Sequence, residues 1–500
     1  MGYRSLLVPA VAALAAGACS APIHRPVSVG PLDPPTAIVD ATLWDGTGRA
    51  PVPHAVTLVR GNRILCAGGV GECQIPRDAR VIDAHGAWLI PGLIDSHVHL
   101  LFLLRGSASE DLANDLKDLL AQGVTTVRDM GTNPVELLAR TRALGAAPRV
   151  YAMQLVAGFR FFYGREQVVT TDGSVAYRLP QAQIMEMRGW TPMMFTRDDD
   201  ADSLAAEAKK TGAIGLKLYG YLDSTLVRKL TEAAHRAGMT AWGHAWVQPA
   251  NPRDQVLAGE DGVVHASLFV GDLFSATGRD SLLASTAILW AGAHDATPES
   301  GLDPRIGETL DSMARRGTFL EPTLDVTIRS VAHYDAQHAD QPSLPEQYAR
   351  AAVGFSMAVT RQAAKRGVRL TAGTDHVAYG PVRDRASLAS ELRLLVDSIG
   401  LSPEAALLAA TRDAAVAIGG EAARSVGTIE AGRYADLLLL DRSPLDDIRN
   451  LDGIQWVMQD GRLWRPWQLR SGIAMHEGAA DSTWADPDAD EPALAHPGAR

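Results

Sequence analysis

Most of this chain alternates short apolar runs with longer stretches in which apolar residues recur at helical spacing. Between about residues 91 and 426, the apolar runs include GLIDSHVHL, VTTVRDMG, IGLKLYG, TAWGHAW and GVVHAS. Helical patterns separate the runs, as in residues 112–122 and 224–237. Alternating strands and helices over this length favour parallel βαβ units, and eight such units form a (β/α)₈ barrel. We therefore predict an α/β protein with a TIM-like barrel at its centre, over residues 91–426.

The two flanks of this centre have a different pattern. Residues 37–90 and 427–470 contain short alternating strands, such as TAIVDATLWDG and GTIEAGRYADLLLLD, punctuated by Gly and Asp. Two β-rich ends around a long centre predict that the N- and C-terminal segments pair as a composite β-sandwich. Residues 471–500 are rich in Ala, Asp, Glu, Pro and Gly, a composition typical of a flexible tail.

The first 19 residues have the pattern of a secretory signal peptide. Arg4 precedes an apolar core and a run of small residues, and the core is too short to span a bilayer. The tetrapeptide AGAC, which ends at Cys19, resembles a bacterial lipobox, in which the cysteine is lipidated after cleavage. This predicts a protein secreted across the inner membrane as a periplasmic or outer-membrane lipoprotein, with residues 20–36 as its linker. The alternative is plain cleavage near Ala18 and a soluble periplasmic product.

Composition and charge narrow the range of partners. An apolar content of 46% and a charged content of 21% are ordinary for a soluble globular chain. The net charge of −11 argues against a nucleic-acid partner. We expect a small-molecule substrate and a membrane contact only through lipidated Cys19, and a homo-oligomer stays open. The other cysteines, Cys66 and Cys73, can form a local disulfide in an oxidising compartment; two free thiols are the alternative.

Four histidines lie at the ends of predicted strands. His97 and His99 alternate along one strand, so both imidazoles lie on the same face and can bind one metal ion. His244 and His265 each end a later apolar run. We place the first pair on barrel strand 1, His244 on strand 5 and His265 on strand 6, with FLEPTLDV as strand 7. Active sites of such barrels lie at the carboxyl ends of the strands, where these histidines lie.

Lys217 and Asp375 extend this set on predicted strands 4 and 8. Lys217 lies between apolar neighbours, where an unpaired charge is costly. A lysine with a lowered pKa can react with CO₂ to form a carbamate, whose two oxygens can bridge two metal ions; an ion pair with Asp375 is the alternative. Asp375, in LTAGTDH, can bind a metal and transfer a proton, or it can serve as a helix N-cap.

These residues lie in motifs that resemble the metal-dependent amidohydrolase superfamily, in the subgroup similar to imidazolonepropionases and prolidase-like carboxypeptidases. The resemblance is carried by PGLIDSHVHL, GVTTVRDMG, GLKLYG, GHAW, VVHAS and AGTDH, and by LSPEAALLAATRDAAVAIG and GTIEAGRYADLLLLD. It extends over roughly residues 37–465. It implies the same architecture as the hydrophobic pattern, a distorted TIM barrel with a composite β-sandwich.

The resemblance also implies roles for the site residues. It assigns six ligands to two divalent metal ions, expected to be zinc: His97, His99, Lys217, His244, His265 and Asp375. The first two histidines and the aspartate are expected to bind the more buried ion, and the other two histidines the second. Carboxylated Lys217 and a hydroxide would bridge the ions. The hydroxide attacks the substrate carbonyl, and Asp375, the catalytic residue, protonates the departing nitrogen.

Three further residues are predicted to contact the substrate. Tyr219 faces the same side of its strand as Lys217. Arg160 lies in the aromatic segment AGFRFFYGREQ and can meet a substrate carboxylate, although this segment can also pack on the barrel rim. His376 directly follows the predicted catalytic aspartate. Arg128 is instead expected to form a structural ion pair with a nearby carboxylate.

The sequence favours one function and leaves two alternatives. The favoured function is hydrolysis of a C–N bond, in an N-acyl amino acid or a dipeptide. Imidazolonepropionases use one metal and no bridging lysine, so Lys217 favours the two-metal, prolidase-like branch. The same site can hydrolyse a lactone, an ester or a phosphotriester. The last alternative is a lipoprotein that binds a ligand without turnover, which a complete set of metal and proton-transfer residues disfavours.

Overall fold

The computed structural model describes residues 34–470 apart from 102–108, 164–165, 170–174, 179–181, 184–185, 187–189, 275–296, 330–343 and 378–386. The predicted signal segment with Cys19, most of the 20–36 linker and the 471–500 tail therefore lie outside the described residues. Within the described ranges, no helix combines the length and the apolar composition needed to cross a membrane.

The centre of the molecule is a sheet of parallel strands in the order β16-β15-β14-β13-β12-β8-β7-β6-β17, with β11 also paired to β8. These strands are β6 (Leu93–His99), β7 (Val124–Asp129), β8 (Arg149–Gly158), β11 (Met193–Phe195), β12 (Gly215–Leu218), β13 (Thr240–His244), β14 (Gly262–Val264), β15 (Phe319–Glu321), β16 (Arg369–Leu370) and β17 (His376–Val377). Because β16 pairs with β15 and the following β17 pairs with β6, the last strand segment joins the two ends of the sheet. The predicted TIM-like barrel is confirmed.

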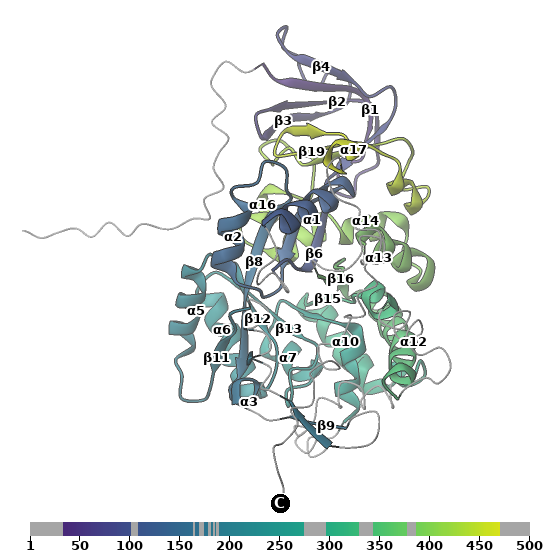
Figure 1. Ribbon diagram of the computed structural model, residues 1–500. Coiled ribbons are helices and arrows are strands. Elements are labelled where there is room, and N and C mark those ends of the chain that lie inside the picture. Colours follow the sequence, from purple (N-terminus) through teal and green to yellow (C-terminus); the bar gives the residue numbers. More distant parts are fainter. Residues whose placement is uncertain are drawn as a thin grey trace, which may run out of the picture.

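Helices surround these strands (Figure 1). They are α1 (Ser109–Ala121), α2 (Pro134–Thr141), α3 (Phe159–Tyr163), α5 (Ala201–Lys210), α6 (Ser224–Arg236), α7 (Pro252–Ala258), η1 (Ala266–Leu273), η2 (Ser300–Leu302), α10 (Pro304–Arg316), α12 (Leu344–Lys365), α13 (Leu388–Leu394), η4 (Leu395–Ile399), α14 (Pro403–Ala409), α15 (Arg412–Ile418) and α16 (Ala422–Ser425). Helix α6 shows why they form where they do. Asp223 caps its first turn by accepting hydrogen bonds from the Thr225 and Leu226 amides, and Leu226, Val227 and Leu230 bury one face against the barrel.

The two ends of the chain build a second sheet, in the order β20-β19-β18-β5-β1-β2-β3, with β4 paired to β1. Its strands are β1 (Thr36–Leu43), β2 (Val52–Arg60), β3 (Arg63–Gly68), β4 (Arg80–Asp83), β5 (Trp88–Pro91), β18 (Leu437–Leu440), β19 (Ile454–Gln459) and β20 (Arg462–Trp464); η5 (Ile448–Asp452) and α17 (Pro466–Arg470) flank them. The N- and C-terminal segments meet where β5 pairs antiparallel with β18. The predicted union of the two ends is confirmed. Figure 1 shows this sheet at one end of the barrel, with α3 and the β9 (Glu166–Val169) and β10 (Val175–Arg178) hairpin region at the other.

A buried cluster of charges joins the barrel to the terminal sheet. Arg149, at the start of β8, contacts Asp460 at 2.9 Å and Asp436 at 3.5 Å. Its guanidinium lies 3.7 Å from the ring centre of Tyr434, and the guanidinium of Arg63 lies at the same distance from that ring. Because barrel and terminal residues both contribute, this cluster fixes how the two parts meet.

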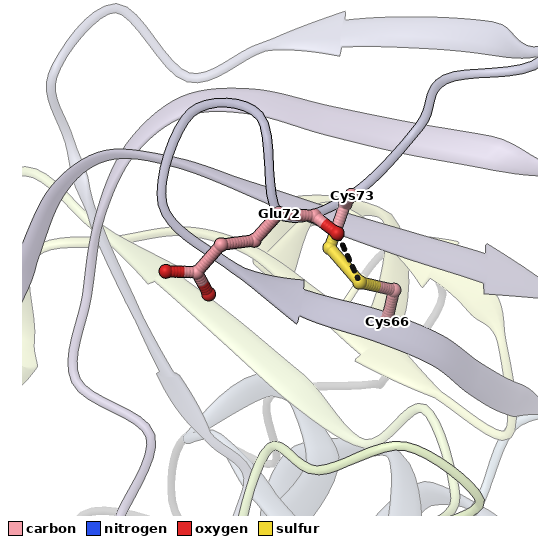
Figure 2. Close-up of a disulfide and its surroundings, with 3 residues drawn as sticks. All are labelled: Cys66, Glu72 and Cys73. Atoms are coloured by element: carbon pink, nitrogen blue, oxygen red, sulfur yellow. Dashed lines mark hydrogen bonds between the residues drawn. A yellow bond between two sulfur atoms is a disulfide. The ribbon is translucent and has the colours of Figure 1, made fainter.

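A disulfide joins Cys66 and Cys73 in the terminal sheet, with a Cα–Cα distance of 5.8 Å. It links β3 to the loop that follows, and Figure 2 shows Glu72 of that loop beside the bridge. Of the two states that the sequence left open, the structure therefore has the disulfide rather than two thiols.

Candidate metal centre

Three donor atoms converge at the carboxyl end of β6. The Nε2 atoms of His97 and His99 lie 3.3 Å apart. The Oδ1 atom of Asp375, just before β17, lies 3.3 Å from the first and 3.2 Å from the second. Two imidazole nitrogens and one carboxylate oxygen that all face one another are the donor set of a divalent metal such as Zn²⁺. The predicted first group of ligands therefore comes together, and its chemistry fits a metal ion.

The electrostatics of this group also fit a cation. Burial by itself raises the pKa of Asp375, but the neighbouring imidazoles outweigh it and hold that pKa well below its usual value. Burial lowers the pKa of His97, although Asp375 and Glu321 oppose it. An ionised Asp375 and a neutral His97 imidazole are the protonation states in which these two groups bind metals.

His244 and His265 form a second group next to the first. Their ring centroids lie 4.8 Å apart, and the ring of His265 lies 5.1 Å from that of His97. Nδ1 of His265 lies 4.0 Å from Oδ2 of Asp375, so the carboxylate lies between the two groups. Burial lowers the pKa of both imidazoles, and that of His265 falls to about 3. For His244, the positive charge of Lys217 adds to this effect. Both rings are therefore neutral and able to bind a metal.

Lys217, on β12, is completely buried. Among the described residues its Nζ has no hydrogen-bond partner, and no ion pair joins it to Asp375 there. Burial lowers its pKa to about 7, although the charges of Glu321 and Asp375 oppose this. At this pKa part of the amine is unprotonated at neutral pH, and an unprotonated amine is the form of lysine that reacts with CO₂.

Glu321, at the end of β15, is a residue of the site that the sequence did not single out. Its carboxylate accepts hydrogen bonds from His97 Nδ1 at 2.8 Å, Arg128 at 3.1 Å and the hydroxyls of Ser96 and Thr371. Burial raises its pKa, but the charge of Arg128 and these hydrogen bonds overcome that effect and lower it to about 2. The predicted structural ion pair of Arg128 is present. A lone glutamate in the apolar run FLEPTLDV was the available signal.

The segment between β16 and Asp375 passes very close to β6. A Cβ atom on Gly373 would lie 2.6 Å from Cβ of His97 and 2.8 Å from the carboxylate carbon of Glu321, so only glycine fits there. Asp95 accepts hydrogen bonds from the amide and the hydroxyl of Thr374, at 3.0 and 2.6 Å. These contacts fix the backbone next to Asp375.

A second unpredicted residue, Thr323, contacts His265. Its Oγ1 lies 2.8 Å from His265 Nδ1. His265, Thr323 and Asp375 have φ angles of 67°, 51° and 53°, which are uncommon for residues other than glycine. Strain of this kind persists where the surrounding structure fixes it, and it gathers at functional sites.

Aromatic rings line one side of the candidate centre. Tyr219 lies with its ring centroid 4.2 Å from that of His244, as expected for a residue on the same strand face as Lys217. Phe161, from the aromatic segment of α3, meets Tyr219 edge-on at 5.6 Å. Trp190, a third residue missed from the sequence, stacks on His99 at 4.8 Å.

The other two predicted substrate residues have different surroundings. Arg160 is exposed on α3. His376 is buried, and its Nε2 contacts Asp115 of α1 at 3.1 Å. The substrate-binding role of these two side chains stays a prediction.

Comparison with known proteins agrees with this architecture. The model described as "Amidohydrolase family" matches residues 88–463. The imidazolonepropionase of Acidiphilium cryptum is 26% identical over 416 residues, which cover 83% of this chain and 92% of that protein. The crystal structure of a Xaa-Pro dipeptidase with bound methionine has a TM-score of 0.62 at 20% identity and covers 86% of this chain and 100% of its own. Aspergillus niger ochratoxinase has a TM-score of 0.63 at 18% identity, covering 87% and 97%.

The two likenesses to solved structures support the fold alone, whereas the family match extends over most of the chain. The predicted resemblance is confirmed: this protein belongs to the amidohydrolase family, which is generally metal-dependent, and it is a hydrolase that acts on C–N bonds.

Proposed function

We propose that this protein is a two-metal amidohydrolase that cleaves the amide bond of an N-acyl amino acid or a dipeptide. The main supporting observation is the convergence of His97, His99 and Asp375 within 3.3 Å of one another. Two further groups support a second ion. Lys217 is buried, and its Nζ has no hydrogen-bond partner among the described residues. His244 and His265 are close enough to Lys217 that its charge lowers the pKa of both imidazoles. One ion would need only the first three donors.

The chain offers a ligand set for each ion. His97, His99 and Asp375 would hold one divalent ion, zinc in our proposal. His244 and His265 would hold the second, and the oxygens of carboxylated Lys217 would contribute to both. When bound, such ions lower the pKa of water and polarise the substrate carbonyl.

The protein groups would then move the proton and orient the substrate. The carboxylate of Asp375 would accept a proton from the attacking water and pass it to the amide nitrogen as the C–N bond breaks, which yields a carboxylic acid and an amine. Tyr219 lies beside His244, where its hydroxyl can meet a substrate on that side of the site. The aromatic rings on this side would exclude water from the reacting amide.

Two further observations support the proposal. One is that a relative similar over most of this chain is an imidazolonepropionase, in keeping with hydrolysis of a C–N bond. The other concerns the number of ions: Lys217 is fully buried and its pKa is lowered by burial to about 7, which favours the two-metal branch over a site with one ion.

Metal content per chain is the first test. We expect about two zinc ions in the purified wild type, and a clear decrease in Lys217→Ala. A substrate panel of N-acyl amino acids and dipeptides, with lactones, esters and phosphotriesters as comparison, then identifies the bond cleaved. One ion unchanged in Lys217→Ala would contradict the bridging role. Turnover of the comparison substrates alone would favour the alternative hydrolase, and a protein without metal would favour ligand binding without catalysis.

We also propose that the protein is a lipoprotein of the periplasm or the outer membrane. The lipobox-like sequence that ends at Cys19 supports lipidation, and the disulfide between Cys66 and Cys73 fits an oxidising compartment. Labelling with a radioactive fatty acid should mark the wild type and not Cys19→Ser. Release of both proteins in soluble, unlabelled form would contradict lipidation.

A further inference from the structure

The imidazoles of the candidate ligands differ in what holds them in place. Nδ1 of His97 is hydrogen-bonded to Glu321, and Nδ1 of His265 to Thr323. Nδ1 of His99 is also buried, but it has no hydrogen-bond partner in the part of the chain that the structure describes. A metal-binding imidazole usually has such a partner, because it fixes the plane of the ring.

An aromatic stack is found where that hydrogen bond is missing. The indole of Trp190 lies on the ring of His99, with centroids 4.8 Å apart and planes inclined by only 26°. Both side chains are buried, with exposed fractions of 3% for Trp190 and 7% for His99. The ring of His99 therefore cannot turn about its Cβ–Cγ bond without losing this contact.

Trp190 is itself held in place by the barrel. It packs with Leu155 and Phe161 in one apolar cluster, and it meets Tyr219 edge-on at 6.3 Å. The backbone directly after it is tied to β8, because Gln154 Nε2 donates a hydrogen bond of 2.7 Å to the carbonyl of Thr191. The indole is thus a rigid surface rather than a loosely attached side chain.

We propose that Trp190 is a positioning residue of the metal centre, which sets the plane of His99 so that Nε2 points at the donors of His97 and Asp375. This inference rests on the proposed metal-dependent function. Metal binding draws electron density from an imidazole, and the electron-rich face of an indole favours such a ring. The stack therefore stabilises the metal-bound state more than the free one, and its loss should weaken metal binding rather than only the fold.

The test compares two substitutions at this position. Trp190→Met keeps most of the volume but removes the aromatic face, whereas Trp190→Phe keeps a ring that can stack. Trp456→Met is the matched control, because Trp456 is also buried but lies in the core of the terminal sheet. The zinc-loaded full-length proteins are challenged with increasing chelator, and the zinc retained per chain is measured. Trp190→Leu replaces the methionine variant if that variant does not fold.

We expect zinc affinity to fall about tenfold or more in Trp190→Met, which is the usual effect of removing a group that orients a ligand. It should stay close to wild type in Trp190→Phe and Trp456→Met. Cobalt-substituted protein gives a second readout, because its absorption bands report ligand geometry: the bands should change in Trp190→Met alone. Equal zinc retention in wild type and Trp190→Met, or an equal loss in Trp456→Met, would overturn the role of Trp190 and leave the proposed function intact. A wild type that binds no zinc would overturn both.

Discussion

The carboxylate of Glu321 accepts a hydrogen bond from Nδ1 of His97 at 2.8 Å, and both side chains are fully buried. Arg128 contacts the same carboxylate at 3.1 Å and also donates a hydrogen bond of 2.7 Å to the carbonyl of Ser96. Because Nδ1 carries the proton in this pair, the lone pair of His97 is on Nε2, which faces the other donors. The charge that orders this candidate ligand is therefore supplied by a residue outside the group of converging donors.

Replacing Glu321 with glutamine tests this relationship. Glu321→Gln keeps the size of the side chain but leaves the guanidinium of Arg128 buried without its counter-charge. We expect zinc affinity to fall roughly 10- to 100-fold and the free energy of unfolding to fall by about 3–5 kcal/mol. Chelator competition and urea unfolding measure the two effects. Glu308→Gln, at an exposed ion pair with Arg253, is the matched control and should change neither.

The contact between Thr323 and His265 leads to a second prediction. Thr323→Val removes the hydroxyl that meets Nδ1 at 2.8 Å and keeps the branched shape of the side chain. We expect the ion bound by His265 to be held about tenfold more weakly, so that one of two zinc ions leaves at lower chelator concentration. Thr323→Ser keeps a hydroxyl and should behave like the wild type. Simultaneous loss of both ions in Thr323→Val would show that the two positions are not independent.

A third prediction concerns pH and lies far from the metal centre. The hydrogen bond of His235 to Asp261, 2.9 Å long, raises the pKa of His235 above its ordinary value of 6.5. The folded state therefore binds the proton more tightly than the unfolded state. The resulting stability is fully present below pH 6.5 and is lost as the pH rises through the folded-state pKa.

The measurement is the difference in Tm between wild type and His235→Gln. The wild type should exceed the variant by more at pH 5.5 than at pH 8.5, with a small effect because the pair is partly exposed. Asp261→Asn should remove the pH dependence of this difference. A difference that is constant across the range, or larger at high pH, would contradict the assignment.

The candidate ligands could be picked out from the sequence because they lie at or near the ends of apolar runs. His97 and His99 share a strand face because side chains alternate along a strand. Lys217 and His244 lie at or near the carboxyl ends of β12 and β13, which pair side by side in parallel. In such a barrel, strand order alone gathers these residues at one end. The same reasoning explains the confirmed fold, since patterns of period two and 3.6 fix which elements form.

What the sequence did not reveal depends on side-chain direction and on contacts between distant segments. Glu321 orders a histidine more than 200 positions away, and nothing local marks it except a charge within an apolar run. Trp190 lies outside any motif. His376 shows the limit of chain proximity: its place next to Asp375 suggested a pocket role, and that role stays a prediction, while its ring contacts Asp115 of α1.

The junction between the barrel and the terminal sheet leads to the last prediction. Arg149 contacts Asp460 and Asp436 and lies on the ring of Tyr434. Burial raises the pKa of Asp436, and the charge of Arg149 opposes that rise. In Arg149→Met this opposing charge is gone, so a buried carboxylate must either stay ionised at a high cost or take up a proton.

We expect Arg149→Met to lower the free energy of unfolding by about 3–5 kcal/mol, as measured by urea unfolding. The loss should be larger at pH 8 than at pH 5, because protonation of the stranded carboxylates relieves it at the lower pH. Zinc content per folded chain should stay at the wild-type value, since the cluster joins the two parts without touching the candidate metal centre. Arg449→Met, at an exposed contact with Asp397, is the control and should be nearly neutral. A variant that unfolds like the wild type would show that apolar packing alone holds the barrel against the terminal sheet.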